Sequence, residues 1–283
     1  SLSFSNQHHS LTSNFPLSHY LLSAACAIYT EKFFGHNNLL SGTIPPLIGQ
    51  LDFLVELDLS DNNLSGTIPS ELFGIVDLEK VLLCRNDLIG SISSNIGNLA
   101  SLTNLWLDNN DLTGKIPEEI TNLIALENLL LEGNELTGVI PNGISSLTQL
   151  NFTNFASNNL SGPIPPGIFD IPNLRFLYLS NNNLSGQIPD TISNAELLKD
   201  LYLDGNLLRG EIPDIPSGTL TNLEELLVNG NNLTGEMPSS ICNLRDNSAT
   251  PGSLVSLFAD CLSPPDPPEI SCSPGCCTRC FSD

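Results

Sequence analysis

Histidines are the first side chains in this chain of 283 residues that could carry out acid–base chemistry. There are four of them, His8, His9, His19 and His36, and none follows residue 36. No Ser-His-Asp arrangement, HExxH motif, phosphate-binding loop or dinucleotide fingerprint accompanies them in the sequence. The histidines therefore indicate no hydrolytic, metalloprotease or nucleotide-binding site.

A thiol and many carboxylates are the other groups that could react. A catalytic thiol needs a neighbouring base to hold it as thiolate, and Cys84 has only Arg85 beside it. Paired carboxylates such as Glu118 and Glu119 could hydrolyse glycosides only if one of them lay in a desolvated pocket. A chain with 31 Asp and Glu residues places such pairs on its surface without any catalytic purpose. We expect no catalytic residue, metal site or cofactor, and hence no enzyme.

Six of the eight cysteines lie near the C-terminus, where two chemistries fit them. The spacing Cys272-x3-Cys276-Cys277-x2-Cys280 could offer four thiolates to zinc. The alternative, a cap stapled by disulfides, is favoured by the signs of an oxidising compartment described below. Sequence alone does not choose among the fifteen possible pairings, although adjacent cysteines are expected to have different partners. The six are Cys242, Cys261, Cys272, Cys276, Cys277 and Cys280.

Composition excludes several classes of partner. The chain carries 9 basic and 31 acidic residues, a formal net charge of −22, which repels nucleic acid and anionic lipid. No run of 18 apolar residues occurs, so the sequence predicts no membrane span. The apolar segment 17–29 could be the end of a signal peptide, but a short helix closing the first repeat is favoured.

The element that must position any site is a repeat of 24 residues. The phrase around Asn62 reads LDLSDNNLSGTIP, and the phrase around Asn182 reads LYLSNNNLSGQIP. Every step between equivalent asparagines is 24 residues except the last, which is 25. We expect these side chains to bond the backbone and form an internal ladder. They are Asn38, Asn62, Asn86, Asn110, Asn134, Asn158, Asn182, Asn206 and Asn231.

Each position of the phrase L-x-L-x-x-N-x-L-x-G-x-I-P has a physical role. The first two leucines alternate as in a strand with one buried face, the glycine permits a tight backbone, and Ile-Pro holds an extended return. The segment after it, such as EEITNLIALENL from Glu118, predicts a short helical or 3₁₀ turn. One repeat cannot bury its own apolar face, so neighbours must stack into a solenoid with a shared core.

The L-x-G-x-I-P return, seen at residues 64–69 as LSGTIP, resembles the plant-type leucine-rich-repeat family. That family includes receptor-kinase ectodomains, secreted polygalacturonase inhibitors and similar algal proteins. The resemblance covers residues 31–244 and implies an α/β solenoid, a right-handed superhelix of about nine repeats with a parallel concave sheet. It further implies an extracellular recognition module, secreted or on the cell surface. Two departures occur, since no paired-cysteine cap is recognisable before Asn38 and the first repeat lacks the usual strand leucines.

This reading predicts three regions and a binding face. Residues 1–30 are expected to be irregular with a short capping helix, residues 31–240 to form the solenoid, and residues 241–283 to form the cap. The side chain between the two inward leucines faces the concave solvent, where aromatic residues are typical of binding hot spots. The ring of Tyr178 is expected to face solvent there, so that Tyr178→Ala would reduce ligand binding but change stability by less than about 0.5 kcal/mol. The candidate binding residues are Asp58, Leu82, Trp106, Leu130, Phe152, Phe176, Tyr178, Asp200, Tyr202, Asp204 and Leu227.

Five N-x-[ST] sequons predict N-linked glycans and an oxidising compartment. Four of them directly follow a ladder asparagine and so fall on one lateral edge. The acceptors are Asn63, Asn151, Asn159, Asn183 and Asn232.

Two functional hypotheses fit these observations. The first is a recognition module that binds a peptide, protein or polysaccharide on the concave face. The second is a structural acidic glycoprotein that assembles with itself or with an extracellular matrix, and the weak N-terminal cap motivates it. An ice-binding surface would need a regular file of threonines. The residues after the repeat glycine do not form one, since they read Thr67, Ser91, Lys115, Val139, Pro163, Gln187, Glu211 and Glu236.

Overall fold

A computed structural model describes residues 2–3, 30–245, 254–260, 270–272 and 276–281. The chain divides into two compact units, Ser1–Thr137 and Gly138–Asp283. The helix expected within residues 17–29 lies outside the described residues, as does Cys261.

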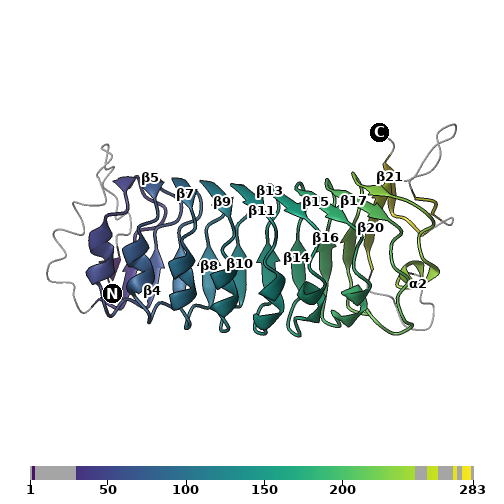
Figure 1. The fold of residues 1–283 in the computed structure, drawn as a ribbon, viewed down its shortest axis with the longest axis horizontal. Coiled ribbons are helices and arrows are strands. Elements are labelled where there is room, and N and C mark those ends of the chain that lie inside the picture. The colour runs from purple at the N-terminus through teal and green to yellow at the C-terminus, as the bar shows by residue number, and fades with distance from the viewer. Residues whose placement is uncertain (1, 4–29, 246–253, 261–269, 273–275, 282–283) are drawn as a thin grey trace. The chain divides into compact units, whose positions relative to one another are not determined.

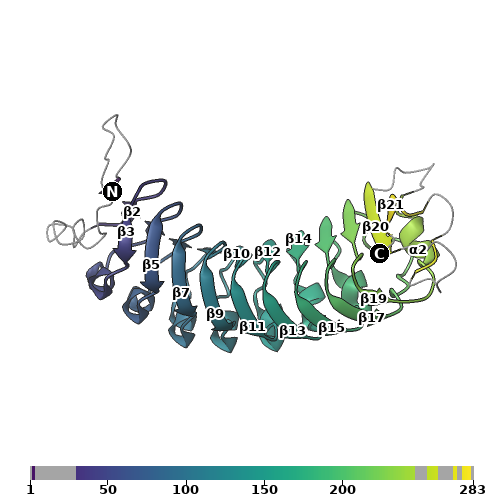
Figure 2. The same cartoon turned by 90° about the horizontal axis from the view of Figure 1, so that it is seen from above.

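Unit 1 contains two parallel sheets connected by short 3₁₀ helices. Its long sheet has the order β1-β2-β4-β6-β8-β10, and its second sheet contains β3, β5, β7, β9 and β11. Figure 2 shows the repeats of this unit, purple to teal, standing side by side. The long-sheet strands are β1 (Leu2–Ser3), β2 (Lys32–Phe34), β4 (Glu56–Asp58), β6 (Lys80–Leu82), β8 (Asn104–Trp106) and β10 (Asn128–Leu130). The others are β3 (Ser41–Thr43), β5 (Asn63–Thr67), β7 (Asp87–Ser91), β9 (Asp111–Lys115), β11 (Glu135–Gly138), η2 (Pro46–Gln50), η3 (Ser70–Gly74), η4 (Ser94–Asn98) and η5 (Glu118–Asn122).

Unit 2 repeats the same arrangement. Its long sheet has the order β12-β14-β16-β18-β20-β21, and its second sheet contains β13, β15, β17 and β19. Figure 1 shows the successive coils of this unit in teal and green, each beside the next. The long-sheet strands are β12 (Phe152–Asn154), β14 (Phe176–Tyr178), β16 (Asp200–Tyr202), β18 (Glu225–Leu227), β20 (Ser256–Asp260) and β21 (Arg279–Phe281). The others are β13 (Asn159–Gly162), β15 (Asn183–Gly186), β17 (Leu207–Gly210), β19 (Asn232–Leu233), η6 (Asn142–Ser146), η7 (Pro166–Asp170), η8 (Asp190–Asn194) and α2 (Ser239–Cys242).

Strand alternation creates the core. In the three-residue long-sheet strands from β2 to β18 the middle side chain points inward, as Leu57 and Leu201 do with no exposed surface. Burying each such leucine stabilises the fold by about 1.5–3 kcal/mol. The first repeat uses Phe33, 1% exposed, in place of a leucine. At Gly66 the backbone has φ +74°, and an added Cβ would lie 2.8 Å from Thr43 Cγ2, so only glycine fits this turn.

The repeat asparagines connect neighbouring turns through their side-chain amides. Asn110 Nδ2 donates to the carbonyls of Leu83, Leu107 and Asp108, and its Oδ1 accepts from Leu88 N–H at 3.0 Å. Asn86, Asn134, Asn182, Asn206 and Asn231 make the equivalent bonds within their own units. Each amide therefore satisfies backbone groups that the turn leaves unpaired.

The C-terminal region both extends the long sheet and carries disulfides. β20 pairs in parallel with β18, and β21 pairs with β20, so the sheet continues beyond residue 240. Disulfides join Cys242 to Cys276 and Cys272 to Cys277. The side chain of Cys280 lies outside the described part of the chain. The predicted fold, a right-handed leucine-rich solenoid with a disulfide-stapled C-terminal cap, is confirmed.

Candidate functional site

The candidate site lies on the solvent side of the long-sheet strands, which we call the front face. Parallel pairing aligns equivalent residues of neighbouring strands, for example Tyr178 with Tyr202 and Tyr202 with Leu227. All eleven candidate binding residues are partly exposed on this face. Asp58, Leu82, Trp106 and Leu130 belong to unit 1, and the other seven belong to unit 2.

Four rings in unit 2 form what we call the aromatic patch: Phe152, Phe176, Tyr178 and Tyr202. The Tyr178 and Tyr202 rings are stacked, with centroids 4.4 Å apart and an interplanar angle of 11°. Phe152 meets Tyr178 edge-on at 5.2 Å and Phe176 edge-on at 5.7 Å. Such offset and edge-on pairs stabilise one another by about 0.5–1.5 kcal/mol each. The patch is thus a packed surface of fixed geometry.

Carboxylates surround the two tyrosines. Tyr178 Oη donates to Asp200 Oδ2 at 3.0 Å, and Tyr202 Oη donates to Glu225 Oε2. Ser180 Oγ donates to Asp204 Oδ1 at 2.5 Å. Burial raises the pKa of both tyrosines and of Asp200, and the negative charge of Glu225 contributes to each rise. The hydroxyls are consequently held as donors to the carboxylates.

Tyr178 is partly exposed, but it is not isolated. Its ring contacts Tyr202 and Phe152, and its hydroxyl is bonded to Asp200, so these contacts argue against the small stability change expected for Tyr178→Ala. Sequence reasoning also passed over Glu225. The last step of the repeat is 25 residues, so the period alone places Glu225 beside Asp200 on the neighbouring strand. The sequence could therefore have identified Glu225.

The front face of unit 1 centres on Trp106, which lies between Leu82 and Leu130 on the neighbouring strands. Two buried polar atoms here, the indole Nε1 of Trp106 and Oδ1 of Asp108, have no hydrogen-bond partner among the described residues. A buried polar atom without a partner costs about 1–3 kcal/mol, so water or a ligand would be favoured beside each.

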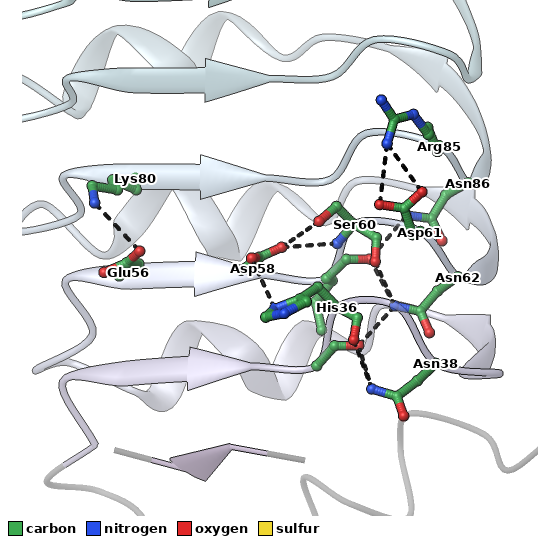
Figure 3. A network of polar contacts seen from close by, with 12 residues as sticks. His36, Asn38, Glu56, Asp58, Ser60, Asp61, Asn62, Lys80, Arg85 and Asn86 are labelled. Carbon is green, nitrogen blue, oxygen red and sulfur yellow. Dashed lines mark hydrogen bonds and ion pairs between the residues drawn. The ribbon is translucent and has the colours of Figure 1, made fainter. Parts of the chain in front are cut away.

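Unit 1 also brings a serine, a histidine and an aspartate together, as Figure 3 shows. Asp58 lies between the other two: His36 Nδ1 is 3.0 Å from its Oδ2, and Ser60 Oγ donates to its Oδ1 at 2.5 Å. A hydrolytic triad requires the histidine in the middle, accepting the proton of the serine. The order here leaves the Ser60 hydroxyl bonded to a carboxylate, which does not activate it as a nucleophile.

Ion pairs join the strands around this network. Glu56 contacts Lys32 at 3.0 Å and Lys80 at 3.4 Å, one on each side. Arg85 Nη1 is 3.2 Å from Asp61 Oδ1 at the end of the strands (Figure 3). These exposed pairs contribute little stability, about 0.2–1 kcal/mol each. In this part of the face the carboxylates of Glu56 and Asp61 are therefore already paired with basic side chains.

Several outward positions are more buried than strand alternation predicts. Cys84, Asp108 and Asn154 are 5%, 9% and 7% exposed, although alternation placed all three on the front face. Cys84 and Asp108 each lie two residues beyond the end of a strand, whereas Asn154 is the last residue of β12. Burial raises the pKa of the Cys84 thiol to about 11, so Cys84 is a neutral thiol at pH 7.

The sequon asparagines lie at the edge of the second sheet or close to it. Asn63, Asn159, Asn183 and Asn232 are exposed first residues of β5, β13, β15 and β19. Asn151 is only partly exposed, one residue before β12. Within the described residues, no group of three or more metal-binding side chains occurs, and no helix is long and apolar enough to cross a membrane.

Comparison with known proteins matches the repeat. The Leucine Rich Repeat family model matches residues 53–75, 101–123, 125–147, 173–195 and 222–244. This chain is a plant-type leucine-rich-repeat protein. No match was found among curated proteins compared by sequence.

Solved structures similar to this leucine-rich-repeat protein include ectodomains of plant receptors. The plant peptide hormone receptor RGFR1 in complex with RGF2 is 35% identical, with a TM-score of 0.75 over 86% of this chain and 36% of that one. The Arabidopsis thaliana receptor kinase GASSHO1/SCHENGEN3, in complex with CASPARIAN STRIP INTEGRITY FACTOR 2, is 38% identical (TM-score 0.72; 79% and 26% covered). A plant ice-binding protein is 27% identical (TM-score 0.68; 87% and 77% covered). The chain thus spans about a third of the receptor ectodomains.

Proposed function

We propose that this protein is a non-enzymatic, extracellular recognition module that binds a peptide or protein segment on the front face of unit 2. The observation that carries the proposal is the aromatic patch. Its four rings are each partly exposed, yet they are fixed against one another by stacking and edge-on contacts. A fixed aromatic surface can bury apolar ligand area with little loss of side-chain entropy, which is typical of binding hot spots.

Two further observations support a peptide ligand. The strands of the patch present alternating side chains at regular spacing, which suits an extended chain lying across them. Two of the similar receptor structures are complexes, one with RGF2 and the other with CASPARIAN STRIP INTEGRITY FACTOR 2. The lack of an activated nucleophile in the Ser60–Asp58–His36 network supports the non-enzymatic part of the proposal.

Other functions have weaker support. A polysaccharide would also stack on aromatic rings, but the tyrosine hydroxyls of the patch already donate to Asp200 and Glu225. Ice binding, suggested by one similar structure, needs a regular hydroxyl file, which Lys115, Val139 and Pro163 interrupt. Self-assembly rests on the weak N-terminal cap, and residues 4–29 lie outside the described part of the chain.

A displayed library of random peptides, selected on the purified protein, tests the proposal. Peptides enriched on the wild type should bind Phe176→Ala at least about tenfold more weakly, because the exposed apolar ring is lost. Leu197→Ala is the matched control, since Leu197 is a 37% exposed apolar residue beyond η8 and off the front face. Thermal melts of both variants, with Phe176→Leu as a milder change, separate binding from folding. Failure to enrich any peptide, or equal loss in the control, would refute the proposal.

A further inference from the structure

The chemistry around the aromatic patch identifies the class of ligand, if the front face of unit 2 binds one as proposed above. We infer that the aromatic patch accepts a cationic side chain, arginine or lysine, from a peptide ligand. Its aliphatic stem would lie along the rings of Tyr178 and Tyr202, and its head group would reach the carboxylates of Asp200 and Glu225.

The first step of the argument is which hydrogen-bonding groups this surface offers. Both tyrosine hydroxyls are used as donors, Tyr178 to Asp200 Oδ2 and Tyr202 to Glu225 Oε2. Asp200 Oδ1 has no hydrogen-bond partner among the described residues, and Glu225 Oε1 receives only a 3.4 Å bond from Ser256. The groups left for a ligand are therefore carboxylate oxygens, which accept hydrogen bonds and donate none. Arginine and lysine head groups, in contrast, only donate.

The second step is charge. Asp200 and Glu225 lie opposite each other on adjacent strands β16 and β18. Within the described part of unit 2, neither carboxylate is in an ion pair, because the nearby Lys199 is paired with Glu224 at 2.5 Å. Arg175, one residue before β14, has an exposed side chain, and among the described residues it forms no ion pair with either carboxylate. The net charge of −22 strengthens the preference for a cation and disfavours an anionic ligand.

The third step is shape. A long basic side chain can bury its methylene groups on apolar surface while its charge stays at the rim. Here the rings of Tyr178 and Tyr202 provide the apolar surface, and both are partly exposed.

The electrostatic environment of Asp200 also favours a cation. Burial raises the pKa of Asp200, and the negative charges of Glu225 and Glu224 raise it further, so a bound cation would relieve the unfavourable electrostatics at that carboxylate. Unit 1 differs, because Lys32 and Lys80 already neutralise Glu56 at the equivalent row.

Two matched peptide pools test the inference. The pools are random nonapeptides that are identical except that the central residue is arginine in one and citrulline, its neutral isostere, in the other. Retention of each pool on the immobilised full-length chain is measured by mass spectrometry. The arginine pool should be retained about tenfold better, as expected for a charge-assisted hydrogen bond worth about 1.4 kcal/mol. Raising the salt concentration should reduce the difference.

Variants locate the effect. Asp200→Asn and Glu225→Gln should each reduce the preference for arginine to about threefold or less, because each removes one rim carboxylate. Asp190→Asn is the control, since it removes the same charge from an exposed position on η8 of unit 2. It should leave the preference unchanged.

The outcomes distinguish this inference from the proposed function. Equal retention of the two pools, with both lost in Phe176→Ala, would overturn the cationic preference and leave peptide binding standing. If the preference for arginine persists in Asp200→Asn and Glu225→Gln, the cation does not bind at these two carboxylates. The same conclusion follows if Asp190→Asn weakens the preference equally. Retention of neither pool would overturn the inference and also remove support from the proposed function.

Discussion

At the scale of single residues, the tyrosines of unit 2 show how a partly exposed side chain can have two roles. Tyr178 is packed between Phe152 and Tyr202 and bonded to Asp200, so it supports the surface it belongs to. Its contribution to stability therefore has to be separated from its contribution to binding. The hydroxyl and the ring can be removed one at a time.

Tyr178→Phe should lower the free energy of unfolding by about 0.5–1.5 kcal/mol, because one hydrogen bond to a carboxylate is lost. Tyr178→Ala should lower it by about 2–3 kcal/mol, since the stacked and edge-on contacts are lost as well. Urea titrations followed by circular dichroism measure both values. An alanine variant as stable as wild type would contradict the observed packing.

Asp200 should make stability depend on pH in a direction opposite to that of most carboxylates. Burial raises its pKa in the folded protein, while the hydrogen bond from Tyr178 lowers it. A raised pKa means that the folded state binds the proton more tightly, so the contribution is present at low pH and lost as pH rises through the folded pKa.

Asp200→Asn removes this titration. Tm at pH 7 minus Tm at pH 4 should therefore be more positive in Asp200→Asn than in wild type. Asp190→Asn, which removes an exposed carboxylate, is the control for this difference in Tm. Identical differences in the wild type and both variants would contradict a raised pKa of Asp200.

At the scale of elements, the asparagines fix one turn to the next. Asn134 is 8% exposed; its Nδ2 donates to Leu107, Leu131 and Glu132 carbonyls, and its Oδ1 accepts from Leu112 N–H. No apolar side chain of similar volume can provide these bonds. Each repeat therefore requires an amide group at this position, and a side chain of the same size is not sufficient.

Asn134→Leu should destabilise unit 1 by about 1–3 kcal/mol for each buried backbone group left unpaired. Hydrogen exchange should rise first at the amides of the flanking turns, because each repeat depends on its neighbours. Asn122→Leu makes the same chemical change at an exposed position on η5 and should be nearly neutral. Similar loss of stability in both variants would argue against the ladder.

The edge of the second sheet carries most of the sequons. Asn63, Asn159, Asn183 and Asn232 are exposed, whereas Asn151 is partly buried and its carbonyl accepts from Arg175 and Phe176. Glycopeptide mapping of protein from its native source should find the first four occupied and Asn151 least occupied, because the transferase needs an accessible chain. Bare asparagines at all five positions would contradict both the glycan prediction and the proposed extracellular location.

At the scale of the whole molecule, a solenoid must cover its last repeat, and this chain does so covalently. Cys242–Cys276 spans 34 residues and Cys272–Cys277 spans 5. Longer closed loops restrict the unfolded chain more, so the first bridge should stabilise the cap more than the second.

Cys242→Ser should cost about 3–4 kcal/mol and Cys272→Ser about 2 kcal/mol on the chain-entropy estimate. Calorimetry of the single variants measures the difference, and peptide mapping without reduction checks the pairing. Stoichiometric zinc with free thiols at these positions would instead support the zinc knuckle.

The sequence by itself determined the repeat, the strand register and the positions of the buried leucines and asparagines. It could do so because each 24-residue unit contacts only its neighbours, so local periodicity contains the packing rule. The register predicts that Trp106, Tyr178 and Tyr202 lie on the solvent side of the long-sheet strands, and in the structure they are partly exposed there.

Only the tertiary structure decided how those side chains contact one another. The bond from Tyr178 to Asp200 crosses 22 residues of sequence, and the pairings of Cys242 and Cys272 depend on the path of the cap. Cys84 and Asp108 are likewise buried at positions that strand alternation places on the solvent side. Rotamers and loop paths depend on packing across strands, and no periodic pattern encodes that packing.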